Sequence, residues 1–212
     1  MNFRMTLAAT VTAMAALAAA GAQASTLYGP TGATLEMPTD MSVPATFTAQ
    51  GGAGSVSFII DGYASLDGKN SYEDDFSLSL NNTEIFRGTF NLGGGGPDQV
   101  YLEPVGTTWL NDSGNLTNIT WAGGQVMVTA PLALAHGSNT LNFTYTSLSG
   151  PGYAGFQGTG DEGWGLENVR VTGAALAGVP EPATWGLMIV GFGGMGSLLR
   201  RQRRLQPALA RI

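Results

Sequence analysis

The stretch Phe76-Ser77-Leu78-Ser79-Leu80 places an apolar side chain at every second position. The same alternation recurs in Leu141-Asn142-Phe143-Thr144-Tyr145. A period of two is that of a β-strand with one buried face and one solvated face. The pair Asn81-Asn82 follows the first stretch directly and favours a tight hairpin turn. The sequence therefore predicts antiparallel strands joined by short turns.

Similar runs recur along most of the chain, and turn residues such as glycine, aspartate and asparagine separate them. Residues 25–179 show no internal repeat and no helical periodicity of useful length. About ten strands at this spacing predict an all-β fold, namely a two-layer antiparallel β-sandwich of jelly-roll type. The expected strands are Thr34–Met37, Ala45–Thr48, Ser55–Asp61, Asp75–Asn81, Glu84–Asn91, Gln99–Glu103, Leu116–Trp121, Gln125–Ala130, Thr140–Leu148 and Leu166–Thr172.

The charge of the chain is unevenly distributed. Of nine basic residues, only Lys69, Arg87 and Arg170 lie between residues 25 and 179, where fourteen acidic residues give a net charge of −11. A domain this acidic repels phosphate backbones, which argues against nucleic-acid binding. The chain has no cysteine, so disulfides, thiol catalysis and cysteine-ligated metals are excluded.

The N-terminus has the three parts of a secretory signal peptide. A basic start at Arg4 precedes the apolar run Leu7–Ala20, and the small residues Ala22 and Ala24 follow. We expect signal peptidase to remove this signal helix, residues 1–24, by cutting between Ala24 and Ser25. The alternative is an uncleaved membrane anchor or a core helix.

The C-terminus combines an apolar run with a basic end. The run Trp185–Leu199 holds 15 residues without a charge. As a helix it would be about 22 Å long, which is short of the roughly 30 Å hydrocarbon core of a bilayer. Arginines prefer the cytoplasmic side of a membrane and tryptophan suits its interface. We therefore expect a single transmembrane helix at 185–199 that anchors the exported precursor. The basic anchor comprises Arg200, Arg201, Arg203 and Arg204.

The whole tail resembles the PEP-CTERM sorting signal of the PEPxxWA variety. The matching features are Pro180-Glu181-Pro182, Trp185, the stretch Met188–Gly193 and the arginine cluster. The tail departs from that variety at Gly186, where alanine is usual, and in continuing through Leu205–Ile212. The three-part order of motif, apolar helix and basic end is intact.

This resemblance implies processing by an exosortase, a membrane enzyme that reads the signal and removes it. The protein would then pass to the cell surface or the exopolysaccharide matrix of a Gram-negative bacterium. Pro180, Glu181 and Pro182 would be recognition residues of a substrate rather than catalytic residues. Two prolines are expected to hold this segment extended and non-helical. The alternative is an ordinary membrane anchor with a proline-rich stalk.

These features divide the chain into five parts. They are a signal peptide (1–24), a β-sandwich domain (25–173), a linker (174–179), the sorting signal with its helix and basic end (180–205) and a tail (206–212).

An acidic loop is the best candidate for binding a metal ion. Asp67, Asn70, Glu73, Asp74 and Asp75 lie within nine residues, just before a predicted strand. Calcium takes six to eight hard oxygen ligands from flexible loops, so Ca²⁺ is the expected ion. The segment lacks the ligand order of an EF-hand. The alternative is a solvated loop in which Asp and Asn form turns.

A glycine-rich loop at 150–163 is a candidate surface for sugar binding. It carries Tyr153 and Phe156, whose rings could stack on pyranose faces. The alternative is that the aromatic residues pack in the core, which is expected of Trp164 because it adjoins a strand. Further aromatics considered for stacking are Tyr63, Tyr72, Trp109 and Trp121.

Catalysis has the least support. His136 is the sole histidine and lies in a turn-like segment, and no nucleophile-elbow motif is present. We therefore expect an exported, non-catalytic structural or adhesive protein of the cell surface or of a biofilm-type matrix. The alternatives are a carbohydrate-binding module and a polysaccharide-active enzyme with a carboxylate pair.

Overall fold

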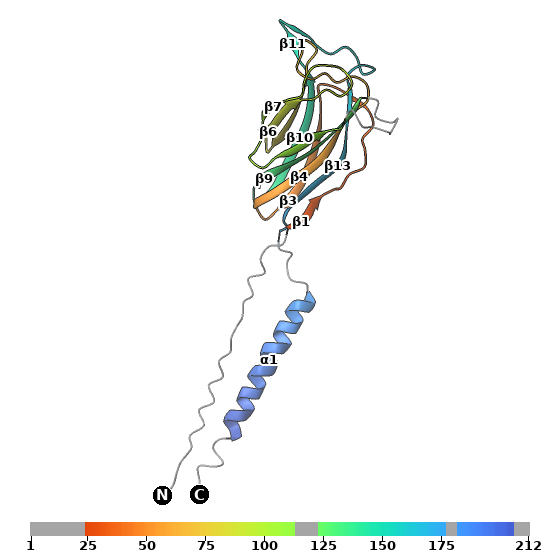
Figure 1. The fold of residues 1–212 in the computed structure, drawn as a ribbon. Coiled ribbons are helices and arrows are strands. Elements are labelled where there is room, and N and C mark those ends of the chain that lie inside the picture. The colour runs from red at the N-terminus through yellow and green to blue at the C-terminus, as the bar shows by residue number, and fades with distance from the viewer. Residues whose placement is uncertain (1–23, 113–122, 177–181, 206–212) are drawn as a thin grey trace, which may run out of the picture. The chain divides into compact units, whose positions relative to one another are not determined.

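The computed structural model describes residues 24–112, 123–176 and 182–205, which fall into two units (Figure 1). The first unit ends at Ala175 and is a sandwich of two antiparallel sheets. The second unit contains one helix, α1 (Pro182–Leu205).

Eleven strands make up the two sheets of the sandwich. All paired strands are antiparallel, as the sequence predicts. The six-stranded sheet has the order β1 (Ala24–Tyr28), β13 (Gly163–Ala174), β4 (Gly52–Gly62), β9 (Gly124–Leu134) and β8 (Thr108–Asn111), with β2 (Met37–Pro38) also paired to β13. The five-stranded sheet has the order β3 (Met41–Ala49), β10 (Gly137–Ser147), β5 (Asp74–Leu80), β6 (Thr83–Thr89) and β7 (Gln99–Leu102).

A separate two-stranded sheet, β11 (Ser149–Gly150) with β12 (Tyr153–Ala154), lies at the end of the sandwich opposite β1 (Figure 1).

The hairpin β5–β6 confirms the pattern that predicts the fold. Phe76, Leu78 and Leu80 are buried, and the serines between them lie on the opposite face. Leu80 pairs with Thr83, so the loop consists only of Asn81 and Asn82. Both asparagines have positive φ, at 51° and 66°. Positive φ at both central residues defines the turn whose twist matches that of the flanking strands.

Aromatic side chains from both sheets fill the core. The ring of Phe58 in β4 lies 5.1 Å from that of Phe143 in β10 and 5.5 Å from that of Phe76 in β5. Trp164 is fully buried, as expected, and its Nε1 donates a 2.9 Å hydrogen bond to the Pro38 carbonyl. The indole can therefore lie in the core without an unsatisfied donor.

The start and the end of the domain meet in one strand pair. Ala24 of β1 is opposite Ala174 of β13, and Ser25 is opposite Gly173. Sequence analysis missed β1, because its residues show no clear alternation. It also missed β8, β11 and β12.

The predicted strand Thr34–Met37 is wrong, since only Met37 falls in a strand. The preceding segment still runs along β13, but the hydroxyls of Thr31 and Thr34 accept hydrogen bonds from Val169 N and Leu166 N. Side-chain acceptors thus replace part of the regular backbone ladder. The predicted strand Leu116–Trp121 lies outside the described residues.

Helix α1 includes the apolar run Trp185–Leu199 but corrects two predictions. It begins at Pro182, so this proline is helical rather than extended. Proline suits the first position of a helix because its missing N–H would have no intrahelical partner there. In the described parts of the chain, no helix is long and apolar enough to cross a membrane, which corrects the transmembrane prediction. The run has only 15 residues, and five of them are glycines.

Candidate functional site

The predicted metal and sugar residues lie in the loops and strand ends at the β11 end of the sandwich (Figure 1). Asp67 and Asn70 shape the first of these loops. Asn70 Nδ2 donates to Asp67 Oδ1 at 2.6 Å, and Asn70 Oδ1 accepts from Tyr72 N at 2.5 Å. The Asp67 N–H donates to Asp74 Oδ2 at 2.9 Å. These contacts are those of turn-forming residues.

A buried acidic cluster lies beside this loop, between the two sheets. Asp74 is fully buried and Glu162 is 1% exposed. Ser147 Oγ lies 2.6 Å from Asp74 Oδ1 and 3.0 Å from Glu162 Oε2. Thr39 Oγ1 lies 2.7 Å from the same serine oxygen, and Gln157 N donates to Glu162 at 2.7 Å. The cluster therefore ties β5, β10 and the loop before β13 together.

Burial changes the protonation of these carboxyl groups. It raises the pKa of Asp74 to about 7, although hydrogen bonds from Asp67 and Ser147 act in the opposite direction. Burial also raises the pKa of Glu162. Removing a carboxylate from water disfavours its charged form, so such groups hold protons at higher pH.

Glu73 and Asp75 lie apart from this cluster. Residues adjacent to Asp74 along a strand point to the opposite face. Glu73 is buried and accepts a hydrogen bond from the Tyr101 hydroxyl. Burial, followed by the neighbouring Glu73, raises the pKa of Asp75 to about 6.

The structure thus divides the five predicted calcium ligands among separate surroundings. Asp67 and Asn70 shape a loop, Asp74 lies between the sheets, and Glu73 and Asp75 face away from it. Across the described ranges, no group of three or more His, Cys, Asp or Glu side chains could hold a metal ion. Calcium binding stays a prediction of the sequence alone.

The predicted stacking residues are exposed on the neighbouring hairpin. Tyr153 is 40% exposed and Phe156 is 45% exposed. The hairpin is attached to the first loop, since Ala154 N donates to Ser71 O at 2.8 Å. Tyr72, next to Ser71, is also exposed. Of the other aromatics considered, Tyr63 donates to the Thr34 carbonyl, Trp109 packs against Phe90, Trp164 lies in the core and Trp121 is outside the described residues.

Sequence analysis missed Tyr101, which organises two cations at this end of the domain. Lys69 Nζ lies 5.8 Å from the centre of the Tyr101 ring, and Arg87 Cζ lies 5.3 Å from it. Both distances are within the range of cation–π attraction. The sequence does show that the domain has only three basic residues, and two of them meet at Tyr101. This scarcity was the one signal in the sequence that could have drawn attention to Lys69 and Arg87.

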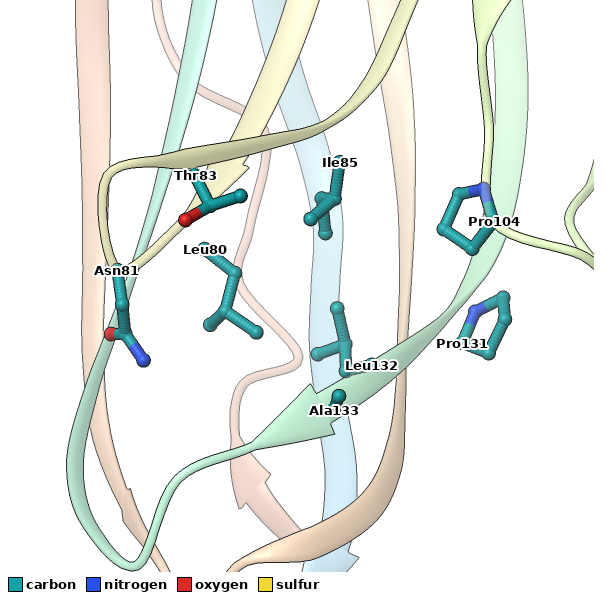
Figure 2. A pocket seen from close by; sticks show the side chains of 8 residues that line it. All are labelled: Leu80, Asn81, Thr83, Ile85, Pro104, Pro131, Leu132 and Ala133. Carbon is teal, nitrogen blue, oxygen red and sulfur yellow. The ribbon is translucent and has the colours of Figure 1, made fainter.

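An apolar groove of about 390 Å³ lies toward the other end of the sandwich, between β9 and the β5–β6 hairpin (Figure 2). The amide of Asn81 in its lining is already engaged, because its Nδ2 donates to Asn139 Oδ1 and its Oδ1 accepts a hydrogen bond from Thr140 N. No titratable side chain lines it, so it offers no acid or base for catalysis. The lining residues are Leu80, Asn81, Thr83, Ile85, Pro104, Pro131, Leu132 and Ala133.

His136 lies far from the acidic cluster. It occupies the turn before β10, beside Gly137, whereas Ser147 ends that strand. Gly137 and Ser147 are the two ends of this strand, ten steps apart, which is about 33 Å at some 3.3 Å per residue. The histidine therefore cannot combine with Asp74 or Glu162 in one site.

The tail forms a second functional region. The backbone of α1 carries Trp185 and the four arginines of the basic end, and Arg200 is exposed. Pro180 and Glu181 lie outside the described residues, as do residues 206–212. The same is true of residues 1–23, which include the predicted cleavage residue Ala22. Residues 178–204 match the model of the PEP-CTERM protein-sorting motif. The chain carries a PEP-CTERM sorting motif.

The PEP-CTERM motif confirms the resemblance inferred from the sequence. It implies processing by an exosortase and marks the chain as an exported protein sorted to the cell surface. The matched region excludes the β-sandwich, so the motif assigns a route and leaves the role of the domain open.

Other comparisons add no functional information. None of the curated proteins matches the chain. Among solved structures, the dimeric latent PorU from Porphyromonas gingivalis is similar at 17% sequence identity and a TM-score of 0.36. The alignment covers 69% of this chain and 12% of that one.

Proposed function

We propose that the mature protein is a non-catalytic structural or adhesive component of the cell surface or of an exopolysaccharide matrix. The observation that carries this proposal is the PEP-CTERM motif at 178–204, which follows a single β-sandwich. In this proposal signal peptidase cuts after Ala24, and an exosortase then releases the domain from the tail.

The position of β1 supports the proposed cleavage site. The strand spans Ala24–Tyr28, so a cut after Ala24 removes only its first residue. Ser25, which would become the new N-terminus, keeps its place opposite Gly173 and its 3.2 Å hydrogen bond to the Gly173 carbonyl.

The strand order supports a jelly-roll domain. One sheet contains β1, β13, β4 and β9 in that order, and the other contains β3, β10, β5 and β6. Numbered one to eight along the chain, these strands have the orders 1-8-3-6 and 2-7-4-5, which is the arrangement of a jelly roll. A jelly roll hosts many unrelated functions, so the fold does not by itself support catalysis or binding.

The surroundings of the acidic groups favour a role without catalysis. A general acid or base must reach its substrate, whereas Asp74 and Glu162 are almost completely buried. Their contacts join structural elements.

Intact-mass spectrometry of the protein from its native host, compartment by compartment, tests the proposed route. We expect an extracellular species that begins at Ser25 and ends near Pro180–Pro182. A membrane species that retains Trp185–Ile212, with no shorter extracellular product, would contradict sorting.

A carbohydrate-binding module is the second candidate function. It is favoured by the exposed rings of Tyr72, Tyr153 and Phe156, which gather on loops at one end of the domain. Exposed aromatic residues on loops are a common basis for recognition. Retention on immobilised polysaccharides tests it: a sugar binder loses retention when Tyr153 and Phe156 become alanine, whereas a scaffold shows no retention to lose.

A further inference from the structure

The three cations of the β-sandwich differ in their surroundings. Arg170 donates a 2.9 Å hydrogen bond to Thr26 Oγ1, across the β1–β13 pair. Lys69 and Arg87 come from separate elements, a loop and β6, and both lie over the ring of Tyr101. In a domain with fourteen acidic residues, this pairing brings two of the three cations to one place.

These two cations remain available to a ligand. Both side chains are exposed. Among the described residues, neither forms an ion pair with a carboxylate, although the Arg87 charge lowers the pKa of nearby Asp75. A cation held by a ring quadrupole keeps its hydrogen-bond donors free for an anion.

Tyr101 is well suited to hold the two cations in place. Its hydroxyl donates to Glu73 Oε1, and Glu73 is only 3% exposed. The Glu73 carbonyl in turn accepts a 2.9 Å hydrogen bond from Leu148 N. The ring is thereby fixed between β7 and the loop, which lowers the entropic cost of presenting Lys69 and Arg87 together.

Tyr153 supplies an aromatic face next to these charges. It lies on β12, where the neighbouring Ala154 N donates a 2.8 Å hydrogen bond to Ser71 O, two residues from Lys69. Its exposed ring offers a surface on which a sugar ring can stack.

We propose that Lys69, Arg87 and Tyr153 form a subsite for an acidic sugar, such as a uronic acid residue of a polysaccharide. The sugar carboxylate binds the two cations, and its ring stacks on Tyr153. Tyr101 is a positioning residue that holds the cations. This inference rests on the carbohydrate-binding candidate above, and it specifies the class of sugar.

An acidic sugar fits this surface better than the alternatives. A neutral sugar would not use the two unpaired cations. A nucleic acid would bring a dense row of phosphates to a domain whose net charge is −11. The carboxylates of a uronate chain are spaced more widely. Of the acidic groups close to Tyr101, Glu73 is occupied by the Tyr101 hydroxyl and Asp75 is partly offset by the Arg87 charge, and at about 0.1 M salt charges beyond roughly 10 Å are screened.

Isothermal titration calorimetry on the full chain tests the proposal, with trigalacturonate as the acidic probe and maltotriose as the neutral one. We expect trigalacturonate to bind and maltotriose to bind at least tenfold more weakly. Lys69→Gln, Arg87→Gln and Tyr153→Ala should each weaken trigalacturonate binding about tenfold. Arg170→Gln removes the third cation as a matched control and should leave the affinity unchanged.

Several results would overturn the inference. Equal affinity for both trisaccharides, or equal losses in Arg87→Gln and Arg170→Gln, would mean that no acidic subsite exists here. Failure of the wild-type chain to bind trigalacturonate would have the same meaning, as would tighter binding of a single-stranded oligonucleotide. Thermal unfolding by circular dichroism separates lost binding from lost folding in each variant.

The outcome is independent of the sorting proposal. A wild-type chain that is sorted normally but ignores trigalacturonate refutes the subsite alone. A chain that binds trigalacturonate but stays in the membrane with its tail refutes the sorting proposal alone.

Discussion

Ser147 Oγ lies 2.6 Å from Asp74 Oδ1, inside the sandwich, and the same serine oxygen is 3.0 Å from Glu162 Oε2. A serine hydroxyl has one proton to donate. It can therefore donate a hydrogen bond to one ionised carboxylate, and it can accept a hydrogen bond from the other carboxyl group only if that group is protonated. Both contacts of Ser147 can be hydrogen bonds when either Asp74 or Glu162 is protonated.

This arrangement predicts that the domain loses stability as the pH rises. The groups facing Asp74 are Asp67, Ser147, Glu162 and the ring system of Tyr145, and none is a cation. The pKa of Asp74 rises from 3.8 to about 7 on folding. The folded state thus binds this proton more tightly than the unfolded state between those values. The stabilisation is complete below about pH 4 and is lost as the pH increases through 7.

Asp74→Asn tests this prediction, because an amide can accept from Asp67 N and donate to Ser147 without titrating. One pKa unit corresponds to about 1.4 kcal/mol, so the loss from Asp74 is on the order of 4 kcal/mol between pH 4 and pH 8. We expect urea unfolding to show a flatter pH dependence in the variant, which should be more stable than wild type at pH 8. Parallel pH profiles for the two proteins would contradict the assignment.

The core makes a second prediction at Phe143. This side chain is fully buried, and its ring packs at 5.1 Å from that of Phe58 in the facing sheet. Phe143→Ala should lower the free energy of unfolding by about 3–5 kcal/mol, since it removes apolar contacts and leaves a cavity. Thr144→Ala, on the opposite face of the same strand, should cost less than about 1 kcal/mol. Similar losses in both variants, measured by urea unfolding, would mean that the faces are wrongly assigned.

The hairpin turn makes a third prediction at Asn82, where φ is 66°. Valine at this position should destabilise the domain by about 1–2 kcal/mol, because a branched side chain disfavours left-handed backbone. Asn82→Gly is the matched control and should be neutral or slightly stabilising. Thermal midpoints that fall equally in both variants would show that the side chain of Asn82, rather than its backbone, matters.

Local patterns could predict those parts of the fold that local interactions determine. The alternation of Phe76–Leu80 and the asparagine pair after it specify a hairpin without reference to the rest of the chain. Strand β1 could not be found in this way. Its partner residues in β13 lie about 150 positions away, and Ser25 is opposite Gly173.

The acidic loop separates residues that lie close together in the sequence. Glu73, Asp74 and Asp75 are close in sequence, which favoured one shared ion site. The period of two that defines the strand sends Asp74 to one face and its neighbours to the other. The Tyr101 cluster could not be predicted from spacing at all, because Lys69, Arg87 and Tyr101 come from three separate elements.

Calcium remains open to a direct test. The amide of Asn70 bonds Asp67, and Asp74 bonds the Asp67 N–H and Ser147, so these oxygens already have partners. We expect calorimetry to give the same melting temperature with excess calcium as with a chelator. A clear rise with calcium, abolished in Asp67→Asn, would restore the predicted ion site.

The sorting motif makes the last prediction. Replacing Pro180, Glu181 and Pro182 with alanine should block exosortase processing in the native host, because the matched motif spans these residues. We expect an unprocessed precursor to accumulate in the cell fraction, with its mass extending to Ile212. Arg211→Ala lies beyond residues 178–204 and serves as the control, so it should be processed like wild type. If the triple variant still yields the extracellular product, the enzyme that releases the domain recognises a different part of the tail.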